Sequence, residues 1–556
     1  DRRLVSQRSR RNTVRKVLSP LFVSLSLVAA LALSGAVAVG QDESPVTGGS
    51  LNLVALNDLA TLDNSQAVQP TDYNMVAGAL YEGLYHFTPE GELEAGLADG
   101  MPEISDDGLV YTIKIKDGAM FAGPDFEPRE VTAADVAYGL TRAVDPAPVG
   151  GAAQSWGAGY LFPIEGAAAF SDGSADNISG IEVIDDKTLQ ITLAEPSVTF
   201  LFGLTIATSW PVPQEAVEAR GEEFGNSPVG AGPFFVKEWN KGSDITIARN
   251  PGYVDPDLPY LDEIRVDLAV DENTQVLRIE SGEADGVFEL FSISPAAVRL
   301  LQQNPDLTVS DGVGPRIFYL ALNNDGIFAD KDLRQAVAQA LSKDFIVQFG
   351  DIAKPWNQLM GSATVQSDPE GTRTYEYDPD AARAIVEEKY DGTPVKIVHD
   401  TADPYTAANS TSLKQDLEAV GFTVDLKTLA TDEFFGAIYD PEAFDISSTF
   451  WSADYPDLQD YISTNFICDL IDILNISRFC DPDIDAEFFA TEGMEFGPER
   501  DAALLAVQQK LIDELAGIPV MEVTPQVVQG PRVGAMPTLA TYAPFDWKRA
   551  WARADG

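Results

Sequence analysis

Residues 450–458 combine residue types that could bind a cationic group. Their sequence is FWSADYPDL, so one carboxylate, Asp454, lies between the aromatic residues Trp451 and Tyr455. A carboxylate attracts a positive charge, and a cation over an aromatic ring gains about 0.5–2 kcal/mol more. The same composition also fits a solvated turn whose rings pack into the core, so the residue types alone leave both interpretations open.

The elements around this segment favour a loop on a rigid scaffold. The apolar run from Phe444 to Ser448 predicts a buried strand. Pro456 cannot donate a backbone hydrogen bond, so the segment is predicted to be a loop at the end of that strand. Loops held in this way frequently carry binding residues.

Composition argues against histidine-dependent chemistry. The chain has two histidines, His86 and His399, which lie far apart in the sequence. This leaves little room for His-based zinc sites and for Ser-His-Asp or Cys-His triads. No phosphate-binding glycine loop or zinc-protease motif is found, so we expect no cofactor and no metal. A secreted hydrolase that uses two carboxylates remains an alternative from another class.

Length and charge limit the class of protein further. The 556 residues are enough for two to four domains, and 45 % of them are hydrophobic, as in soluble globular proteins. With 87 acidic and 37 basic residues, the formal net charge is −50. Such a charge repels phosphate backbones, so nucleic acid is not expected as a partner.

The first 40 residues predict an export signal. Basic residues gather in 1–16, residues 17–41 carry no charge, and 36–38 read AVA, a cleavage-type pattern. Cleavage and retention as an anchor both remain open, as do the general and twin-arginine routes. No cysteine follows the apolar run, so no lipid anchor is expected. The protein is predicted to work in the periplasm or on the outer face of the cytoplasmic membrane.

The two cysteines are close in sequence. In an exported protein, Cys468 and Cys480 favour a disulfide, with two free buried thiols as the alternative.

Strand and helix patterns alternate through the chain. Thr132 and Asp135 predict a capping box for a helix over 133–144. A further helix is predicted over 75–84. Hairpins are predicted at 181–193 and 234–248. A strand-helix-strand unit is predicted at 395–399, 413–420 and 423–429. This mixture predicts an α/β fold.

Eight ordered stretches resemble the family 5 extracellular solute-binding proteins of ABC importers. They are YEGL at 81–84, SDDG and YTIKIKDG within 105–118, TAADV at 132–136, SPVGAGPF at 227–234, RNPGY at 249–253, GEAD at 282–285, LNN and DLRQA within 322–336, and WSADYPDL at 451–458. The order of the stretches is that of the family.

The resemblance implies a large α/β fold of the two-lobed periplasmic-binding-protein type (type II), with an extra inserted subdomain. Two lobes of such a protein close around a ligand by hinge motion. The expected division is an export signal over 1–40, a linker over 41–50, lobe I over 51–90, 216–310 and 521–556, its inserted subdomain over 91–215, and lobe II over 311–520.

The resemblance also implies a function and a site. The protein would capture a peptide and deliver it to the permease subunits of an ABC importer. It would act as a monomer and would not be an enzyme. Asp454 would pair with the α-amino group of the peptide, and Trp451, Ala453 and Tyr455 would line the pocket. A different solute remains an alternative: an oligosaccharide, a metal chelate or a cationic solute.

One departure from the family bears on the length of the ligand. In dipeptide-specific members a loop after the strand equivalent to 395–399 carries an arginine for the ligand carboxylate. Here residues 400–405 read DTADPY, without a basic residue. Arg316 is the nearest alternative. An oligopeptide held through its backbone and amino end therefore fits better than a strict dipeptide.

Overall fold

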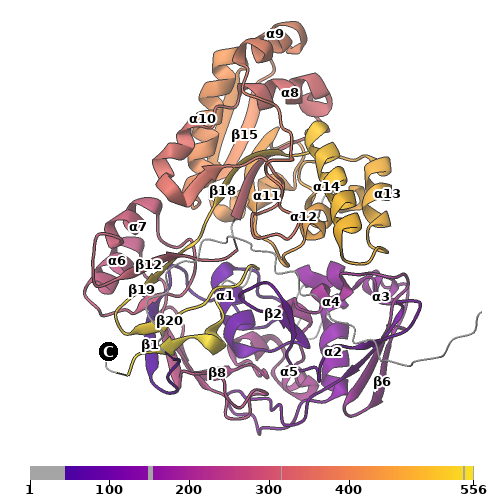
Figure 1. The fold of residues 1–556 in the computed structure, drawn as a ribbon, viewed down its shortest axis with the longest axis vertical. Helices are drawn as coiled ribbons and strands as arrows, with labels where there is room; N and C mark the ends of the chain where they lie inside the picture. The colour runs from indigo at the N-terminus through magenta and orange to yellow at the C-terminus, as the bar shows by residue number, and fades with distance from the viewer. Residues whose placement is uncertain (1–43, 148–154, 315, 472, 542–544, 555–556) are drawn as a thin grey trace, which may run out of the picture. The chain divides into compact units, whose positions relative to one another are not determined.

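The computed structural model describes residues 44–147, 155–314, 316–471, 473–541 and 545–554 (Figure 1). The predicted export signal at 1–40 lies outside these residues. Helices and strands alternate through the described chain, and the strands form two large sheets, one four-stranded sheet and two small ribbons.

A seven-stranded sheet combines three distant parts of the sequence. Its central strand β1 pairs in parallel with β10 on one side and with β11 on the other. The strand order is β12 (Thr308–Asp311), β19 (Gln526–Gln529), β11 (Gly286–Val287), β1 (Ser50–Val54), β10 (Glu263–Asp267), β9 (Asp244–Arg249) and β8 (Phe234–Asn240). Helices α6 (Glu272–Glu280) and α7 (Pro295–Leu301) pack on one face, where Val54, Val287 and Val528 join their apolar residues.

A six-stranded mixed sheet is formed by the later part of the chain. Its order is β14 (Ala353–Pro355), β18 (Ile518–Val523), β13 (Arg316–Leu322), β17 (Ile446–Trp451), β15 (Val395–Asp400) and β16 (Val424–Leu429). In β13, Phe318 and Leu320 pack into one core, whereas Ile317 and Tyr319 pack into another. Both faces of this strand are therefore buried, which explains its continuous apolar sequence.

Helices cover both faces of the six-stranded sheet. One core contains residues of α8 (Lys331–Ala340), α9 (Pro379–Lys389) and α10 (Pro404–Val420). The other contains residues of α11 (Thr431–Ile438), α12 (Leu458–Asn465), α13 (Pro482–Ala490) and α14 (Pro498–Asp513). The predicted strand-helix-strand unit is confirmed as β15, α10 and β16, although α10 begins nine residues earlier than predicted.

The four-stranded sheet is antiparallel throughout. Its order is β4 (Glu103–Ile104), β5 (Val110–Lys114), β7 (Thr188–Thr192) and β6 (Ile181–Asp185), and the predicted hairpin is β6 and β7. Helix α2 (Ala133–Val144) contacts this sheet and has its predicted bounds. The backbone N–H and the hydroxyl of Thr132 donate to Asp135 Oδ2, at 2.9 and 2.7 Å. The Thr132 side chain also accepts from the Asp135 N–H, so both bonds of the predicted capping box are present.

The remaining elements are short. They are β2 (Tyr85–Phe87) with β3 (Leu93–Ala95), β20 (Val533–Ala535) with β21 (Trp551–Ala552), the helices α3 (Ala167–Ser171), α4 (Phe200–Gly203) and α5 (Gln214–Arg220), and the 3₁₀ helices Trp156–Leu161, Ala207–Ser209, Gly221–Asn226, Ile327–Ala329, Asp344–Ile352, Cys468–Leu470 and Trp547–Arg549.

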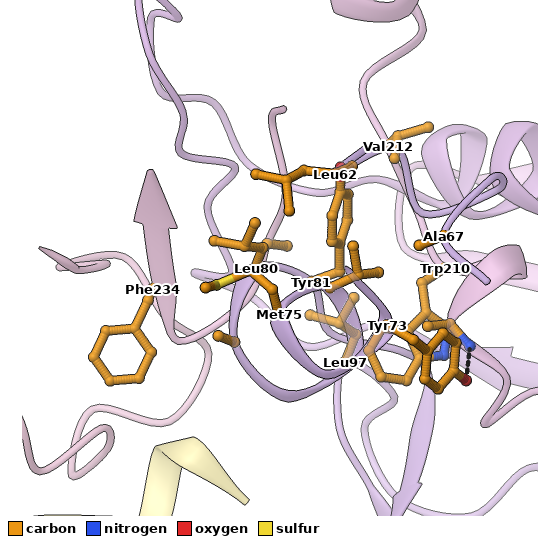
Figure 2. Close-up of a cluster of buried hydrophobic side chains, with 14 of the residues drawn as sticks. Leu62, Ala67, Tyr73, Met75, Leu80, Tyr81, Leu97, Trp210, Val212 and Phe234 are labelled. Carbon is orange, nitrogen blue, oxygen red and sulfur yellow. Dashed lines mark hydrogen bonds between the residues drawn. The ribbon is translucent and has the colours of Figure 1, made fainter. Parts of the chain in front are cut away.

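The helix predicted over 75–84 is wrong in type and position. The structure has a short α-helix, α1 (Pro70–Met75), followed by one π-helical turn, Val76–Leu80. Gly232 approaches the end of this turn so closely that a Cβ atom there would lie 2.4 Å from the Leu80 carbonyl carbon. The chain then turns extended and places Tyr81 in the core (Figure 2).

The chain passes between the two large sheets twice. One passage runs from the end of β12 at Asp311 to the start of β13 at Arg316, and the other from Val523 in β18 to Gln526 in β19. The two passages are side by side, because the Gly312 N–H donates to the Pro525 carbonyl at 2.8 Å.

Cys468 and Cys480 form a disulfide, with Cα atoms 4.7 Å apart. In the part of the chain that the structure describes, no helix has the length and apolarity needed to cross a membrane.

The close approach at Gly232 gives a test of the fold. A Cβ at this position would meet backbone atoms of Ala79, Leu80 and Tyr81 within 2.6 Å, and backbone atoms do not move aside cheaply. Gly232→Ala is expected to lower the free energy of unfolding by about 1–3 kcal/mol or more. Urea unfolding followed by circular dichroism measures this loss.

Gly436→Ala is the matched control, because Gly436 lies in α11 with nothing within 4 Å of the added Cβ. It should be neutral or stabilise by up to about 1 kcal/mol. Equal stability of the two variants would contradict the packing argument.

Candidate ligand-binding site

The loop in the structure is shorter than the loop predicted from the sequence. The strand predicted to end at Ser448 continues to Trp451 in β17. At the other end, Asp457 caps α12 by accepting a hydrogen bond from the Gln459 N–H at 2.9 Å. The loop therefore runs over 452–457. Asp454 lies within it and is 8 % exposed.

The carboxylates of Asp454, in the loop, and of Asp460, in α12, share the hydroxyl group of Tyr160. Tyr160, in the 3₁₀ helix Trp156–Leu161, donates to Asp454 Oδ2 at 2.5 Å. The hydroxyl oxygen of Tyr160 also lies 3.1 Å from Asp460 Oδ1. Asp460 is 0 % exposed. Its second oxygen, Oδ2, accepts hydrogen bonds from the Trp451 indole at 3.0 Å and from the Asp454 N–H at 3.1 Å.

Burial dominates the electrostatics of this pair. Loss of hydration raises the pKa of Asp454 to about 7, although the hydrogen bond from Tyr160 acts in the opposite direction. Burial raises the pKa of Asp460 well above its usual range, and the nearby charge of Asp454 raises it further. Among the described residues, no basic side chain forms an ion pair with either carboxylate. The pair is therefore available to a positive group from outside.

Asp454 lines a partly open cavity of about 50 Å³. The other lining residues are Tyr73, Ala77, Gly78, Tyr81, Glu82, His86, Phe87, Thr205, Trp210, Pro233, Leu539, Thr541, Phe545, Asp546 and Lys548. Aromatic rings and acidic groups thus dominate the wall. Such a lining suits a small solute with an apolar part and a positive charge.

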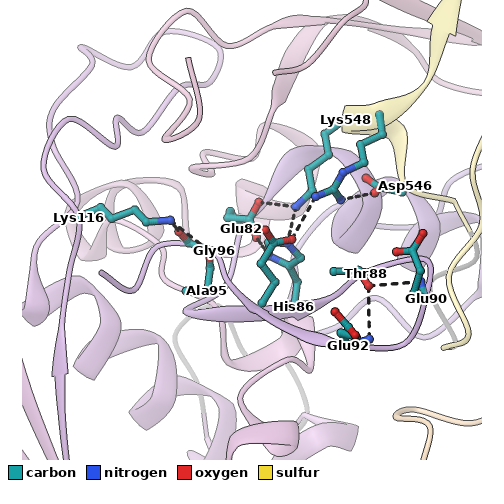
Figure 3. Close-up of polar contacts among 12 residues, drawn as sticks. Glu82, His86, Thr88, Glu90, Glu92, Ala95, Gly96, Lys116, Asp546 and Lys548 are labelled. Carbon is teal, nitrogen blue, oxygen red and sulfur yellow. Dashed lines mark hydrogen bonds and ion pairs between the residues drawn. The ribbon is translucent and has the colours of Figure 1, made fainter. Parts of the chain in front are cut away.

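The basic groups of the cavity wall are already paired (Figure 3). Glu82 is almost fully buried and lies 3.3 Å from Lys548 Nζ and 3.1 Å from His86 Nδ1. Lys548 Nζ also lies 3.1 Å from His86 Nε2. Burial alone would raise the pKa of Glu82, but Lys548 and His86 outweigh it and hold that pKa far below its usual range. The charge of Lys548 is therefore balanced within the protein.

Arg316 is engaged away from this cavity. Its guanidinium lies between the rings of Phe291 and Phe450, 4.1 and 4.0 Å from their centroids. It also pairs with Asp403 at 3.5 Å, and its side chain is 12 % exposed. Asp403 itself caps α10. Arg316 does not line the cavity that contains Asp454.

The other predicted ligand contacts support the loop instead. Trp451 donates to Asp460, and Ala453 is buried. The Tyr455 ring is buried against Tyr160 at 5.9 Å between centroids and against Phe202 at 5.4 Å. These three residues do not line the cavity. Their role as ligand contacts stays a prediction, whereas Asp454 is the predicted residue that the structure places at the cavity.

Several residues at the site were not predicted from the sequence: Tyr160, Asp460, Glu82, His86 and Lys548. One signal was present for Asp460, because an acidic residue three positions after the Asp457 cap resembles a capping box. That pattern predicts a bond back to the cap residue, whereas the carboxylate accepts from Asp454. No local pattern indicates Lys548, which is 466 positions from its partner Glu82.

Among the residues that the structure describes, no group of three or more His, Cys, Asp or Glu side chains could hold a metal ion.

The chain belongs to the family described as "Bacterial extracellular solute-binding proteins, family 5 Middle". The sequence profile of this family matches residues 92–470, which is more than half of the chain. The fold is accordingly the two-lobed, mixed α/β fold of periplasmic binding proteins.

Individual relatives agree with this assignment. Di/tripeptide-binding protein 1 of Pseudomonas aeruginosa is 25 % identical over 500 residues, covering 86 % of this chain and 87 % of the relative. The glutathione-binding protein GsiB of Escherichia coli is 29 % identical over 339 residues, covering 59 % of this chain and 60 % of the relative. The periplasmic binding protein DppA of Helicobacter pylori, solved in complex with peptide STSA, superposes with a TM-score of 0.79 at 21 % identity, covering 91 % of this chain and 98 % of that one.

The buried Glu82–Lys548 pair gives a second test. Lys548→Met would leave Glu82 buried without its cation, which typically costs about 3–5 kcal/mol of unfolding free energy. Adding Glu82→Gln removes the unpaired charge, so the double variant should regain part of that loss. Chemical denaturation of the three proteins checks the order.

The control is Lys237→Met, since the Lys237–Glu263 pair is exposed at 55 % and 35 %. Its cost should stay below about 1 kcal/mol. If Lys548→Met cost no more than this control, Glu82 would not depend on Lys548.

Proposed function

We propose that this protein is the solute-binding component of an ABC importer and that it binds a peptide through the α-amino group at Asp454. One observation carries the proposal: a buried carboxylate lines a cavity and lacks a cation among the described residues. An ammonium group would supply the missing charge, together with hydrogen bonds that replace those lost with water.

The proposed division into lobes follows the sheets. Lobe I would comprise 51–90, 216–310 and 521–556, with the inserted subdomain at 91–215, and lobe II would comprise 311–520. In support, the seven-stranded sheet draws its strands almost wholly from the first set, and the six-stranded sheet almost wholly from the second. The two chain passages near 312 and 525 would then serve as hinges.

An oligopeptide fits the site better than a strict dipeptide. The basic residues of the cavity wall are His86 and Lys548, and both are held by Glu82. Arg316 is held by Asp403 and two rings outside the cavity. The terminal carboxylate of a ligand would therefore lie beyond this cavity. Relatives whose names specify di- and tripeptides support a peptide as the ligand class.

The setting of the proposal is extracytoplasmic. Residues 1–40 would direct export to the periplasm or to the outer face of the cytoplasmic membrane, and the exported monomer would deliver its ligand to permease subunits. Catalysis is not part of the proposal. A two-carboxylate hydrolase needs both groups at the substrate, whereas Asp460 is fully buried and its Oδ2 atom already accepts two N–H groups.

The amine anchor is tested by Asp454→Asn. The substitution keeps the size of the side chain and removes its charge, so affinity for a peptide should fall at least about tenfold, or 1.4 kcal/mol. Mass spectrometry of peptides that co-purify with the wild-type protein identifies the ligand, and calorimetry with the synthetic peptide measures its affinity.

The control for this test is Asp469→Asn, which removes an equal charge from an exposed position. It should leave the affinity unchanged. Equal binding of the peptide and its N-acetylated form to the wild type would refute the amine anchor.

Lobe closure gives an independent test of the binding function. A saturating peptide is expected to reduce the radius of gyration measured by small-angle X-ray scattering, because hinge closure brings the lobes together. Asp454→Asn at the same peptide concentration should show a smaller reduction. An unchanged radius of gyration in the wild type at saturation would contradict the proposal.

A further inference from the structure

The hydrogen atoms around Tyr160 do not suffice for two ionised carboxylates. A tyrosine hydroxyl has one hydrogen, and Tyr160 lies 2.5 Å from Asp454 Oδ2 and 3.1 Å from Asp460 Oδ1. It donates at the shorter contact, to Asp454. The contact to Asp460 is then a hydrogen bond only if Asp460 Oδ1 carries a proton and donates it to the Tyr160 oxygen.

The second oxygen of Asp460 agrees with this protonation state. Oδ2 accepts hydrogen bonds from the Trp451 indole and from the Asp454 N–H, so it is an acceptor and carries no proton. A neutral carboxyl with one donor and one acceptor oxygen therefore satisfies every contact that Asp460 makes. Its complete burial favours the neutral form as well.

Among the described residues, no cation compensates the charge of the pair. The titratable and charged groups that face the pair or lie beside it are Tyr160, Tyr455, Asp457, Glu492 and Arg500, and, around the cavity, Glu82, His86, Asp546 and Lys548. Arg500 is held by Asp457 at 2.8 Å, and Lys548 is held by Glu82. Within the described residues, the two carboxyl groups are thus accommodated by protonation of one of them and not by a neighbouring cation.

We propose that Asp460 is a positioning residue that carries the one proton held by the pair, and that the ligand ammonium binds only while Asp454 is ionised. Below neutral pH, Asp454 also takes up a proton, so that the pair holds two, and the ammonium must displace the proton of Asp454 into the solvent. This rests on the proposed function, since it takes Asp454 as the amine anchor. The protein would then bind its ligand at neutral pH and lose affinity in acid.

Asp460 has a defined task in this arrangement. Its proton fixes the Tyr160 oxygen, so that the Tyr160 hydrogen points to Asp454, and its Oδ2 atom orients the Asp454 backbone. An asparagine can do the same, because its amide nitrogen donates to Tyr160 and its oxygen accepts from Trp451 and Asp454. An alanine can do neither.

The first experiment needs no ligand. Infrared difference spectroscopy at pH 8 compares the wild type with Asp460→Asn. A protonated carboxyl has a carbonyl stretch distinct from that of a carboxylate, so this band should be present in the wild type and missing in the variant. Absence of the band from the difference spectrum would overturn the proposal.

The second experiment measures proton release. Titration calorimetry of the full chain with the probe peptide trialanine is carried out in two buffers of different ionisation enthalpy, at pH 5.5 and pH 7.0. The peptide amine stays charged at both values. Since burial raises the pKa of Asp454 to about 7, affinity should fall about tenfold at pH 5.5, with close to one proton released per peptide.

Equal affinity at both pH values without proton release would overturn the proposal. N-acetyl trialanine distinguishes a failure of the proposed function from a failure of this inference. Equal binding of both peptides, or no binding of trialanine, counts against the proposed function, and the infrared result then decides the protonation of Asp460 alone. Amine-dependent binding without proton release counts against this inference only.

The third experiment compares two substitutions of Asp460. Asp460→Ala should lower the affinity for trialanine at pH 7.0 at least about tenfold, and Asp460→Asn should regain most of that loss and keep the dependence on pH. If Asp460 instead supplied a negative charge, the two variants would be equally weak. Circular dichroism confirms that each variant is folded before binding is compared.

Discussion

The arrangement of the site depends on the hydroxyl of Tyr160. This group comes from a 3₁₀ helix in the first third of the chain, yet it contacts two carboxylates that follow almost 300 residues later. The neighbouring contacts bring the same two regions together: the Tyr455 ring packs on Tyr160 and Phe202, and the Val198 N–H donates to the Glu492 carbonyl at 3.0 Å. Asp454 lies beside these contacts and is 8 % exposed.

Several buried acidic groups among the described residues are paired with cations. Asp63 pairs with Arg142, Glu82 pairs with Lys548, and Asp457 pairs with Arg500. These charges are compensated inside the protein, so they hold elements together. The carboxylate of Asp454 instead receives a single hydrogen bond, from an uncharged tyrosine. A buried group whose charge is left without compensation is a candidate for binding a charge from outside.

The sequence predicted the elements better than the site. Local signals were sufficient for α2, whose capping residues adjoin the helix, and for the β6–β7 hairpin. They failed at 75–84, where the π-helical turn ends in close contact with Gly232, more than 150 residues away, because no local pattern encodes such a contact. Asp454 was found through its resemblance to a family motif. Tyr160 and Lys548 could not be found in this way, since their roles arise from contacts between distant segments that no local pattern encodes.

The two aspartates of the loop show how environment assigns different tasks to one residue type. Asp457 accepts two hydrogen bonds from Arg500, at 2.8 and 3.0 Å, and caps α12 with the same carboxylate. Its charge is thereby satisfied, and it fixes the C-terminal end of the loop to two helices. Trp451 fixes the N-terminal end, because it lies in β17 and its indole binds Asp460. With both ends held, the loop can keep Asp454 buried and uncompensated, a state that a mobile segment would relieve by turning the carboxylate into water.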